Sequence, residues 1–307
     1  MKTVDTIAEV REACGGWRTA GGIVGLVPTM GAFHDGHRSL MEAARAECDR
    51  VVVSLFVNPT QFAPNEDLAA YPRDAEGDRA LAESVGVELL FAPTVEEMYP
   101  EPGRTTVHVA GLTARLCGAD RPTHFDGVTT VVAKLFSITG PCRAYFGRKD
   151  AQQLAVVRRM TRDLDLPVEV IGCPLVRDAD GLAMSSRNAY LGVAERGSAL
   201  GLSRSLRAGA DAVDAGMRNP EMLGEIIAAE IGGEPSMHRE YVEVVDPMTL
   251  EPRTELEGVT LVAVAARVGS TRLIDNMTLE VHGDTVTADL GVTAGAGRYV
   301  PVAGIAP

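Results

Sequence analysis

The chain has 307 residues, of which 42 are acidic and 29 are basic, and its formal net charge is −13. This length exceeds one typical domain and allows a sizeable buried core. The negative charge argues against nucleic acid as a partner, because a nucleic-acid-binding surface needs a basic face. Any anionic ligand must therefore meet cationic side chains that are concentrated at its own site.

The sequence also argues against secretion and against a membrane span. Residues 1–10 mix charges with apolar side chains and show no signal-peptide core, and no apolar run approaches the length of a bilayer. The cysteines are odd in number and lack metal or disulfide spacing, so we expect them to be reduced and mostly structural: Cys14, Cys48, Cys117, Cys142 and Cys173. A cytoplasmic protein is predicted.

The first motif follows the apolar run 23–27 and precedes a helix-like stretch at 38–48; it reads Pro-Thr-Met-Gly-Ala-Phe-His-Asp-Gly-His. A strand, a glycine-bearing turn and a helix start place free backbone N–H groups at a helix N-terminus, which favours phosphate. His34 and His37 are three residues apart, can donate hydrogen bonds and ordinarily titrate near neutrality. A surface turn would fit the same residues. A zinc site would need a third ligand that the spacing does not supply.

The second motif ends a β-branched run at 51–57 that is typical of a buried parallel strand. Asn58 and Gln61 follow it, and their amides fit recognition of a small polar hydroxy acid. A plain Asx-Pro turn is the alternative. The segments 64–67 and 71–74 are polar and contain prolines, and they predict a loop on the side of the active site.

The third motif is Gly-Arg-Lys-Asp at 147–150, between a short strand at 144–146 and a helical pattern at 152–164. Lys149 is expected near a helix N-terminus, where an ammonium group is unfavourable unless an anion lies between it and the dipole. This conflict favours a phosphate ligand over a solvated lysine. Gln153 lies one turn later and can share the face of Lys149.

The fourth motif, at 176–188, ends in Met-Ser-Ser-Arg-Asn. Ser185, Ser186 and Arg187 form a compact donor set for a triphosphate, and arginine adds bidentate geometry. A solvated helix cap is the alternative for the tripeptide alone.

Alternating elements predict an α/β fold with a doubly wound, parallel, Rossmann-like sheet over residues 1–174. The expected strands are 23–27, 51–57, 87–91, 144–146 and 168–171, and the expected helices are 38–48, 75–84, 129–138 and 152–164. Residues 175–283 predict a small α+β domain, with helices at 194–217 and 220–231 and strands at 241–245, 259–266 and 271–273. Its position suggests a lid. Residues 284–307 have few large apolar anchors and are expected to form a flexible tail.

Together the four motifs, in this order, resemble the pantoate–beta-alanine ligase family, and the resemblance runs from about Thr3 to Met277. The His-x-Gly-His and Met-Ser elements alone would indicate only the wider nucleotidylyltransferase superfamily. A transferase acting on another small anionic acceptor is therefore the alternative, although it would lack the glutamine set. A catalytically dead regulator should have lost one of four residues that are all present: His34, His37, Lys149 and Arg187.

The resemblance implies a two-step reaction. ATP and pantoate give an enzyme-bound pantoyl adenylate and pyrophosphate, and the amine of beta-alanine then displaces AMP to form pantothenate. The family also implies Mg²⁺ and a homodimer.

The same resemblance implies roles for individual residues. The ATP contacts would be Met30, Gly31, Ala32, Phe33, His34, Asp35, Gly36, His37, Gly147, Arg148, Lys149, Asp150, Val176, Met184, Ser185, Ser186 and Arg187. His37 would be a general acid or charge stabiliser, and the other catalytic residues would be His34, Lys149, Ser185, Ser186 and Arg187. Gln61 and Gln153 would bind pantoate, and Gln61 also beta-alanine. Arg121 and His124 match a family stretch near the site, without an assigned role.

The ligands of Mg²⁺ stay unassigned. Asp74, Glu76 and Asp78 are nearby acidic candidates, but this stretch departs from the aspartate cluster of the family. Arg148 stands where the family often has a second lysine, which keeps the charge.

Overall fold

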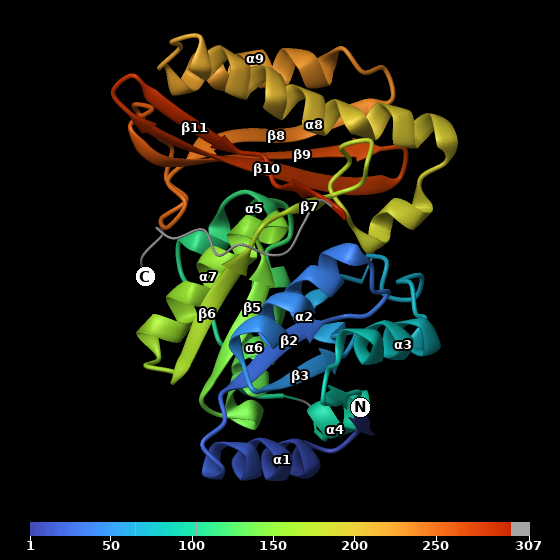
Figure 1. The fold of residues 1–307 in the computed structure, drawn as a ribbon. Helices are drawn as coiled ribbons and strands as arrows, with labels where there is room; N and C mark the ends of the chain where they lie inside the picture. Colours follow the sequence, from blue (N-terminus) through green and yellow to red (C-terminus); the bar gives the residue numbers. More distant parts are fainter. Residues whose placement is uncertain (65, 102, 296–307) are drawn as a thin grey trace.

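The computed structural model describes residues 1–64, 66–101 and 103–295. A six-stranded parallel sheet with helices on both faces lies below a four-stranded antiparallel sheet, whose outer face carries two long helices (Figure 1). The predicted fold class is confirmed.

The first sheet has the strand order β1–β4–β3–β2–β5–β6. Its strands are β1 (Lys2–Val4), β2 (Val24–Thr29), β3 (Arg50–Leu55), β4 (Leu89–Phe91), β5 (Cys142–Gly147) and β6 (Val168–Cys173). The α-helices between them are α1 (Ile7–Thr19), α2 (Asp35–Glu47), α3 (Ala75–Val85), α4 (Val95–Met98), α5 (Cys117–Asp120), α6 (His124–Thr139) and α7 (Ala151–Asp163). Short 3₁₀ turns are η1 (Pro59–Gln61), η2 (Leu112–Ala114) and η3 (Arg148–Asp150).

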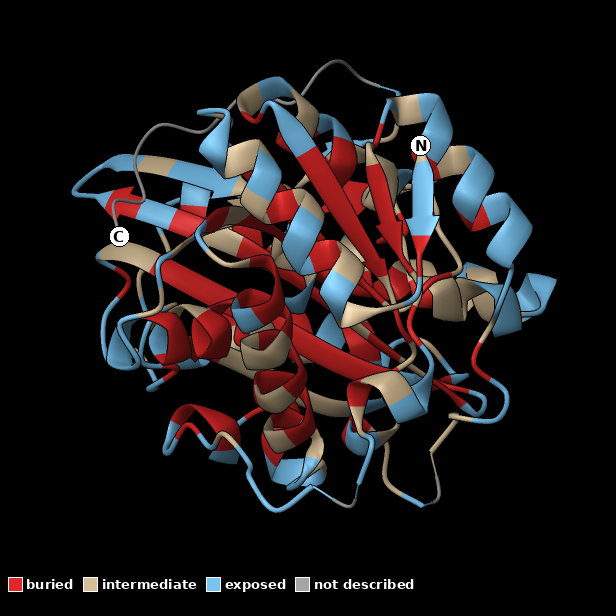
Figure 2. Ribbon diagram, turned by 90° about the horizontal axis from the view of Figure 1, so that it is seen from below, coloured by how far each residue is buried: buried red, intermediate tan, exposed pale blue. Residues whose placement is uncertain are grey.

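Both faces of this sheet are buried, because alternate side chains of each strand point to opposite sides. Leu26 and Val52 pack with α1, α6 and α7, whereas Val27, Val51 and Val53 pack with α2 and α3. Figure 2 shows the strands as mostly buried and the outer helix faces as exposed. The uninterrupted apolar runs of the central strands follow from this double coverage.

The strand order reverses next to β2. After β2 the chain builds β3 and β4 on one side, and it then crosses over to β5 and β6 on the other side. Ligands of doubly wound sheets bind outside the carboxyl ends of the strands at such a switch point. The first and third motifs follow β2 and β5, so the fold brings them together there.

The second sheet follows in the chain. Its elements are β7 (Val176–Arg177), η4 (Ser186–Tyr190), α8 (Val193–Asp214), α9 (Pro220–Gly232), β8 (Met237–Val245), β9 (Gly258–Val268), β10 (Thr271–His282), β11 (Thr285–Asp289) and β12 (Val292–Thr293). The order is β11–β10–β9–β8, and β12 pairs separately with β7. Helices α8 and α9 form a second core with one face of this sheet, and the other face lies toward the first sheet (Figure 1). The change of sheet falls between β6 and β7, next to the expected boundary at residue 174.

The tail expected from residue 284 does not begin there. Residues 285–289 extend the antiparallel sheet, and Val292 pairs in parallel with Val176. Edge strands offer free backbone groups, so a segment of small residues can be ordered by hydrogen bonds without large apolar anchors. The rest of the expected tail, 296–307, lies outside the described residues.

No helix in the described ranges is both long enough and apolar enough to cross a bilayer. The five cysteines are buried free thiols.

Candidate active site

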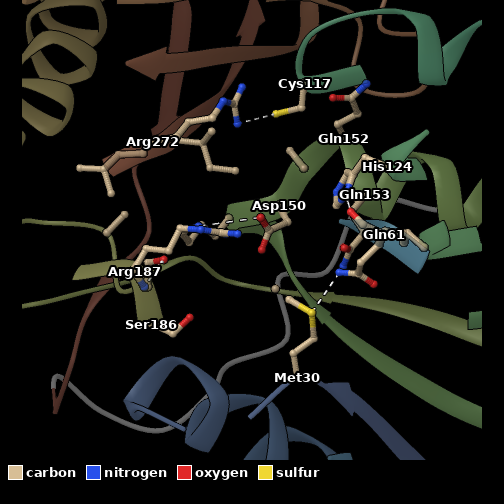
Figure 3. A pocket seen from close by; sticks show the side chains of 18 of the residues that line it. Met30, Gln61, Cys117, His124, Asp150, Gln152, Gln153, Ser186, Arg187 and Arg272 are labelled. Atoms are coloured by element: carbon tan, nitrogen blue, oxygen red, sulfur yellow. Dashed lines mark hydrogen bonds and ion pairs between the residues drawn. The ribbon is translucent and has the colours of Figure 1, made fainter. Parts of the chain in front are cut away.

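A cavity of about 980 Å³ opens at the carboxyl ends of β2, β3 and β5, beneath β10. The candidate site residues from the sequence that line it are Met30, His34, Gly36, His37, Asn58, Gln61, Arg121, His124, Gly147, Lys149, Asp150, Gln153, Val176, Met184, Ser185, Ser186 and Arg187. The expected ATP contacts outside the wall are Gly31, Ala32, Phe33, Asp35 and Arg148. All four motifs therefore meet at one cavity, part of which Figure 3 shows.

The loop after β2 has a strained backbone that Asp78 holds in place. Gly31 and Ala32 have positive φ angles of 94° and 53°, and such a conformation costs a non-glycine residue about 1–3 kcal/mol. The Asp78 carboxylate accepts the N–H groups of Ala32 (2.9 Å) and Phe33 (2.6 Å). Asp78, considered above as an acidic candidate for Mg²⁺, is thus occupied in shaping this loop.

His34 and His37 stack at the start of α2, with ring centroids 4.2 Å apart. His34 Nδ1 accepts the N–H of Gly36 (3.1 Å), and His37 Nδ1 accepts the N–H of His34 (3.3 Å). In the neutral rings the proton is therefore on Nε2. The helix cap thereby orients two N–H donors.

Burial lowers the pKa of His34 to about 4 and that of His37 to about 3, with Lys149 adding to both shifts. The expectation that this pair titrates near neutrality is wrong, because desolvation penalises the imidazolium form. At pH 7 both rings are neutral hydrogen-bond donors. The formal positive charge nearby belongs to Lys149.

Gln61 is held at the cavity wall by its neighbours. Asn58 Nδ2 donates to Gln61 Oε1 (3.0 Å) and to the carbonyl of Gly127 (3.1 Å), while its Oδ1 accepts from Tyr99 (2.9 Å). Gln61 Nε2 contacts Met30 Sδ at 3.0 Å (Figure 3). Asn58 was expected to recognise ligand, but its amide is used in positioning Gln61.

Arg121 and His124 hold the backbone behind Gln61. The carbonyl of Gln61 accepts His124 Nδ1–H (2.9 Å) and a longer bond from Arg121 (3.4 Å). Arg121 also binds Glu66 through two nitrogens, each 2.5 Å from a carboxylate oxygen. Burial lowers the pKa of His124 to about 4, so its ring is neutral at pH 7.

The turn that carries Lys149 is fixed from the second sheet. Asn276 Nδ2 on β10 donates to the carbonyls of Arg148 (3.0 Å) and Lys149 (2.8 Å). The Arg148 side chain instead forms an ion pair with Asp289 on β11 (3.0 Å). Lys149 therefore lines the cavity, while Arg148 links the turn after β5 to strand β11 of the second sheet.

Arg187 is bound to a carboxylate that the sequence motifs do not include. Its Nε and Nη2 each lie 3.1 Å from an oxygen of Asp67, and its guanidinium stands over the ring of Tyr71. Ser186 Oγ lies 3.1 Å from the Tyr71 hydroxyl, and Ser185 caps η4. The loop between the second motif and α3 thus contacts the fourth motif, as its predicted placement on this side implied.

No group of three or more His, Cys, Asp or Glu side chains within the described ranges is arranged to hold a metal ion. Asp74 caps α3 by accepting the N–H of Gly77 (3.0 Å). Asp150 lines the cavity, with Oδ1 3.8 Å from Lys149 Nζ. One such carboxylate, together with phosphate oxygens, is a common donor set for Mg²⁺.

Comparisons with known proteins identify the family of the chain. The family model described as pantoate-beta-alanine ligase matches residues 2–278. A pantothenate synthetase of Moorella thermoacetica is 54% identical over 282 residues, covering 92% of this chain and 100% of that protein. One from Acidobacterium capsulatum is 53% identical over 301 residues, covering 94% and 99%.

Solved structures give the same result. The chain is similar to pantothenate synthetase from Thermus thermophilus, with a TM-score of 0.85 and 49% identity over 90% of this chain and 98% of that one. Its similarity to pantoate-beta-alanine ligase from Francisella tularensis, complexed with beta-gamma ATP and beta-alanine, has a TM-score of 0.74 and 32% identity, covering 90% and 97%. The chain therefore belongs to the pantoate-beta-alanine ligase family.

Proposed function

We propose that this chain condenses pantoate with beta-alanine at the expense of ATP, giving pantothenate, AMP and pyrophosphate. The observation that carries the proposal is that one cavity contains both a set of donors for phosphate and a pair of amides for a small hydroxy acid. Two imidazole N–H donors and Lys149 suit phosphate oxygens, and Gln61 and Gln153 supply amides for a small hydroxy acid. Family membership supports the same reaction.

In the first step, a carboxylate oxygen of pantoate attacks the α-phosphorus of ATP, and the bond to pyrophosphate breaks. This attack brings two anions together, so the protein must supply donors and positive charge in fixed positions. We assign this to the Nε2–H groups of His34 and His37, to Lys149, and to the donor set Ser185, Ser186 and Arg187. No side-chain nucleophile is required.

For Arg187 to reach a phosphate, its two bonds to Asp67 must be exchanged for bonds to the ligand. The guanidinium is preorganised by Tyr71 and Asp67, and phosphate is an equally bidentate acceptor. We therefore expect the loop that carries Asp67 to shift when ATP binds.

In the second step, the amine of beta-alanine attacks the acyl carbon of the adenylate. A carbon–nitrogen bond forms, the bond between the acyl carbon and the phosphate oxygen breaks, AMP leaves, and the amine gives up a proton. Gln61 and Gln153 keep the acyl group in place during this exchange, and Arg121 and His124 stabilise the backbone that carries Gln61.

Mg²⁺ is proposed to enter with ATP, where it would neutralise phosphate charge. Asp150 is the carboxylate beside the phosphate-side residues that could hold it. A homodimer is proposed from the family resemblance, and a cytoplasmic location from the composition of the chain and its free cysteines.

The test is to incubate the purified chain with ATP, Mg²⁺, pantoate and beta-alanine, and then to omit each in turn. We expect AMP and an amide product in equal amounts, only when all are present. A product that retains the nucleotide would instead support a nucleotidylyltransferase with another acceptor.

A further inference from the structure

A second polar cluster lines the cavity, on the second sheet. Arg272, near the start of β10, and Arg267, at the end of β9, both bind Glu240 of β8. The distances are 2.6 Å from Arg272 Nε and 2.9 Å from Arg267 Nε to the two carboxylate oxygens. Two guanidinium groups share one carboxylate, so the cluster keeps one net positive charge. Both arginines belong to the cavity wall.

Arg272 has unused hydrogen-bonding capacity. Its side chain is 16% exposed, and its Nη1 reaches only Cys117 Sγ at 3.3 Å, a weak acceptor. Its Nη2 is buried and has no hydrogen-bond partner among the described residues. Glu240 is shared with Arg267 and Cys117 is a weak acceptor, so the part of this guanidinium that lines the cavity has capacity for an anionic ligand.

The cluster and the glutamines assigned to pantoate line the same cavity. Gln152 Nε2 donates to the carbonyls of Leu112 (2.8 Å) and Arg115 (2.7 Å), which fixes the segment before Cys117 against the start of α7. Gln153 is the next residue of that helix. In Figure 3, Arg272 and Cys117 lie at the top of the pocket, and His124, Gln153 and Gln61 lie along its right side.

The other cations of this wall are otherwise engaged. Arg121 is bound through two nitrogens to Glu66, Arg187 is bound in the same way to Asp67, and Lys149 lies among the phosphate-side residues. The amine substrate carries a carboxylate that none of these accounts for. Its amine must reach the acyl group near Gln61 and Gln153, so its carboxylate must bind a few ångströms away from them.

We propose that Arg272 binds the carboxylate of the amine substrate and thereby selects an amino acid over an amine that lacks a carboxylate. This assignment rests on the proposed function and adds a specificity residue to it. Glu240 and Cys117 act through Arg272, because they hold its guanidinium in place.

The experiment compares Arg272→Gln with the unaltered protein in two assays. Pantoate-dependent exchange of labelled pyrophosphate into ATP needs no amine. Amide formation is then measured with beta-alanine and with 3-aminopropanamide, in which a neutral amide replaces the carboxylate. We expect the exchange to persist and the KM for beta-alanine to rise on the order of tenfold to a hundredfold, since a charge-assisted bond is lost. The preference for beta-alanine over the amide should largely disappear.

Two further variants keep the result decisive. Arg253→Gln removes another arginine of the second domain, which lies outside the cavity wall and binds Asp246 at 2.9 Å. It should leave the KM for beta-alanine and the KM for 3-aminopropanamide unchanged. Arg272→Lys keeps the charge and should give an intermediate KM.

An unchanged KM for beta-alanine, or an unchanged preference over the amide, in Arg272→Gln would overturn the assignment. Loss of exchange from folded Arg272→Gln and Arg272→Lys would also overturn it, because the residue would then serve the first step. Absence of exchange from the unaltered protein would instead reject the proposed function, and this assignment with it.

Discussion

The two histidines of the first motif are neutral donors whose orientation is set by backbone N–H groups. Each Nδ1 is occupied by the helix cap, which leaves each Nε2–H for a ligand. In a buried site this preorganisation has catalytic value, because the donors need no reorientation as charge develops on the phosphate.

Replacing His37 by Ala removes one of these donors. We expect pantoate-dependent pyrophosphate exchange to fall by on the order of a hundredfold or more, the usual loss for a single donor to a developing oxyanion. Circular dichroism and thermal unfolding should show a native fold, since α2 keeps its remaining capping bond to His34. Near-normal exchange by a folded variant would contradict the role of His37.

Single motifs predicted which residues meet, but not what each one binds in the folded chain. The pair Arg187–Asp67 joins positions 120 residues apart, and Arg121–Glu66 joins positions 55 apart. Nothing local in the sequence specifies such partners. Likewise, burial of the histidines depends on the whole cavity, so their lowered pKa values could not be read from the motif.

At the scale of elements, the contact between α6 and η1 decides where Gln61 stands. Gly127 of α6 faces η1 so closely that a Cβ there would lie 2.5 Å from the carbonyl oxygen of Thr60 and 2.6 Å from the backbone N of Gln61. A side chain at this position must push η1 away, because backbone atoms cannot rotate out of the contact.

Gly127→Ala should therefore raise the KM for pantoate at least severalfold in the exchange assay, while the KM for ATP changes little. Gly224→Ala in α9 is the matched control, because no heavy atom outside its own helix backbone and adjacent residues lies within 4 Å of its Cβ position. That control should keep both constants and gain up to about 1 kcal/mol of helix propensity. Equal KM values for pantoate in Gly127→Ala and Gly224→Ala would refute the positioning role of this contact.

Helices with a regular repeat of apolar residues, and strands with a run of β-branched residues, were predictable from the sequence. The central strands and the helices predicted from the sequence agree with the structure to within a few residues at most boundaries, because burial on both faces demands continuous apolar runs. Helix α1, of 13 residues, was not predicted. Strands β1 and β11 were not predicted, since edge strands are short and polar. Strand β10 runs nine residues beyond its expected end at 273, as its interior contains the buried polar residues Asp275 and Asn276.

The whole molecule should lose stability in mild acid through its buried histidines. The pKa values of His34 and His124 are about 4 and that of His37 is about 3, whereas an unfolded histidine has about 6.5. As the pH falls below that value the unfolded chain binds protons first, so this contribution is complete above pH 6.5 and declines below it. Each histidine then adds a slope of up to about 1.4 kcal/mol per pH unit.

Denaturant unfolding between pH 7 and 5 measures this slope. We expect the free energy of unfolding to decrease toward pH 5, and to decrease less steeply in His37→Asn, which lacks one of the titrating rings. Parallel curves for the two proteins would show that His37 is not neutral and buried in the native state.

The molecule as a whole encloses a cavity that should activate a carboxylate before any amine is needed. The most direct test is exchange of labelled pyrophosphate into ATP by the unaltered protein, with pantoate and Mg²⁺ but without beta-alanine. We predict exchange that depends on pantoate and stops when pantoate is omitted. No exchange, from folded protein that still binds ATP, would contradict the adenylate mechanism.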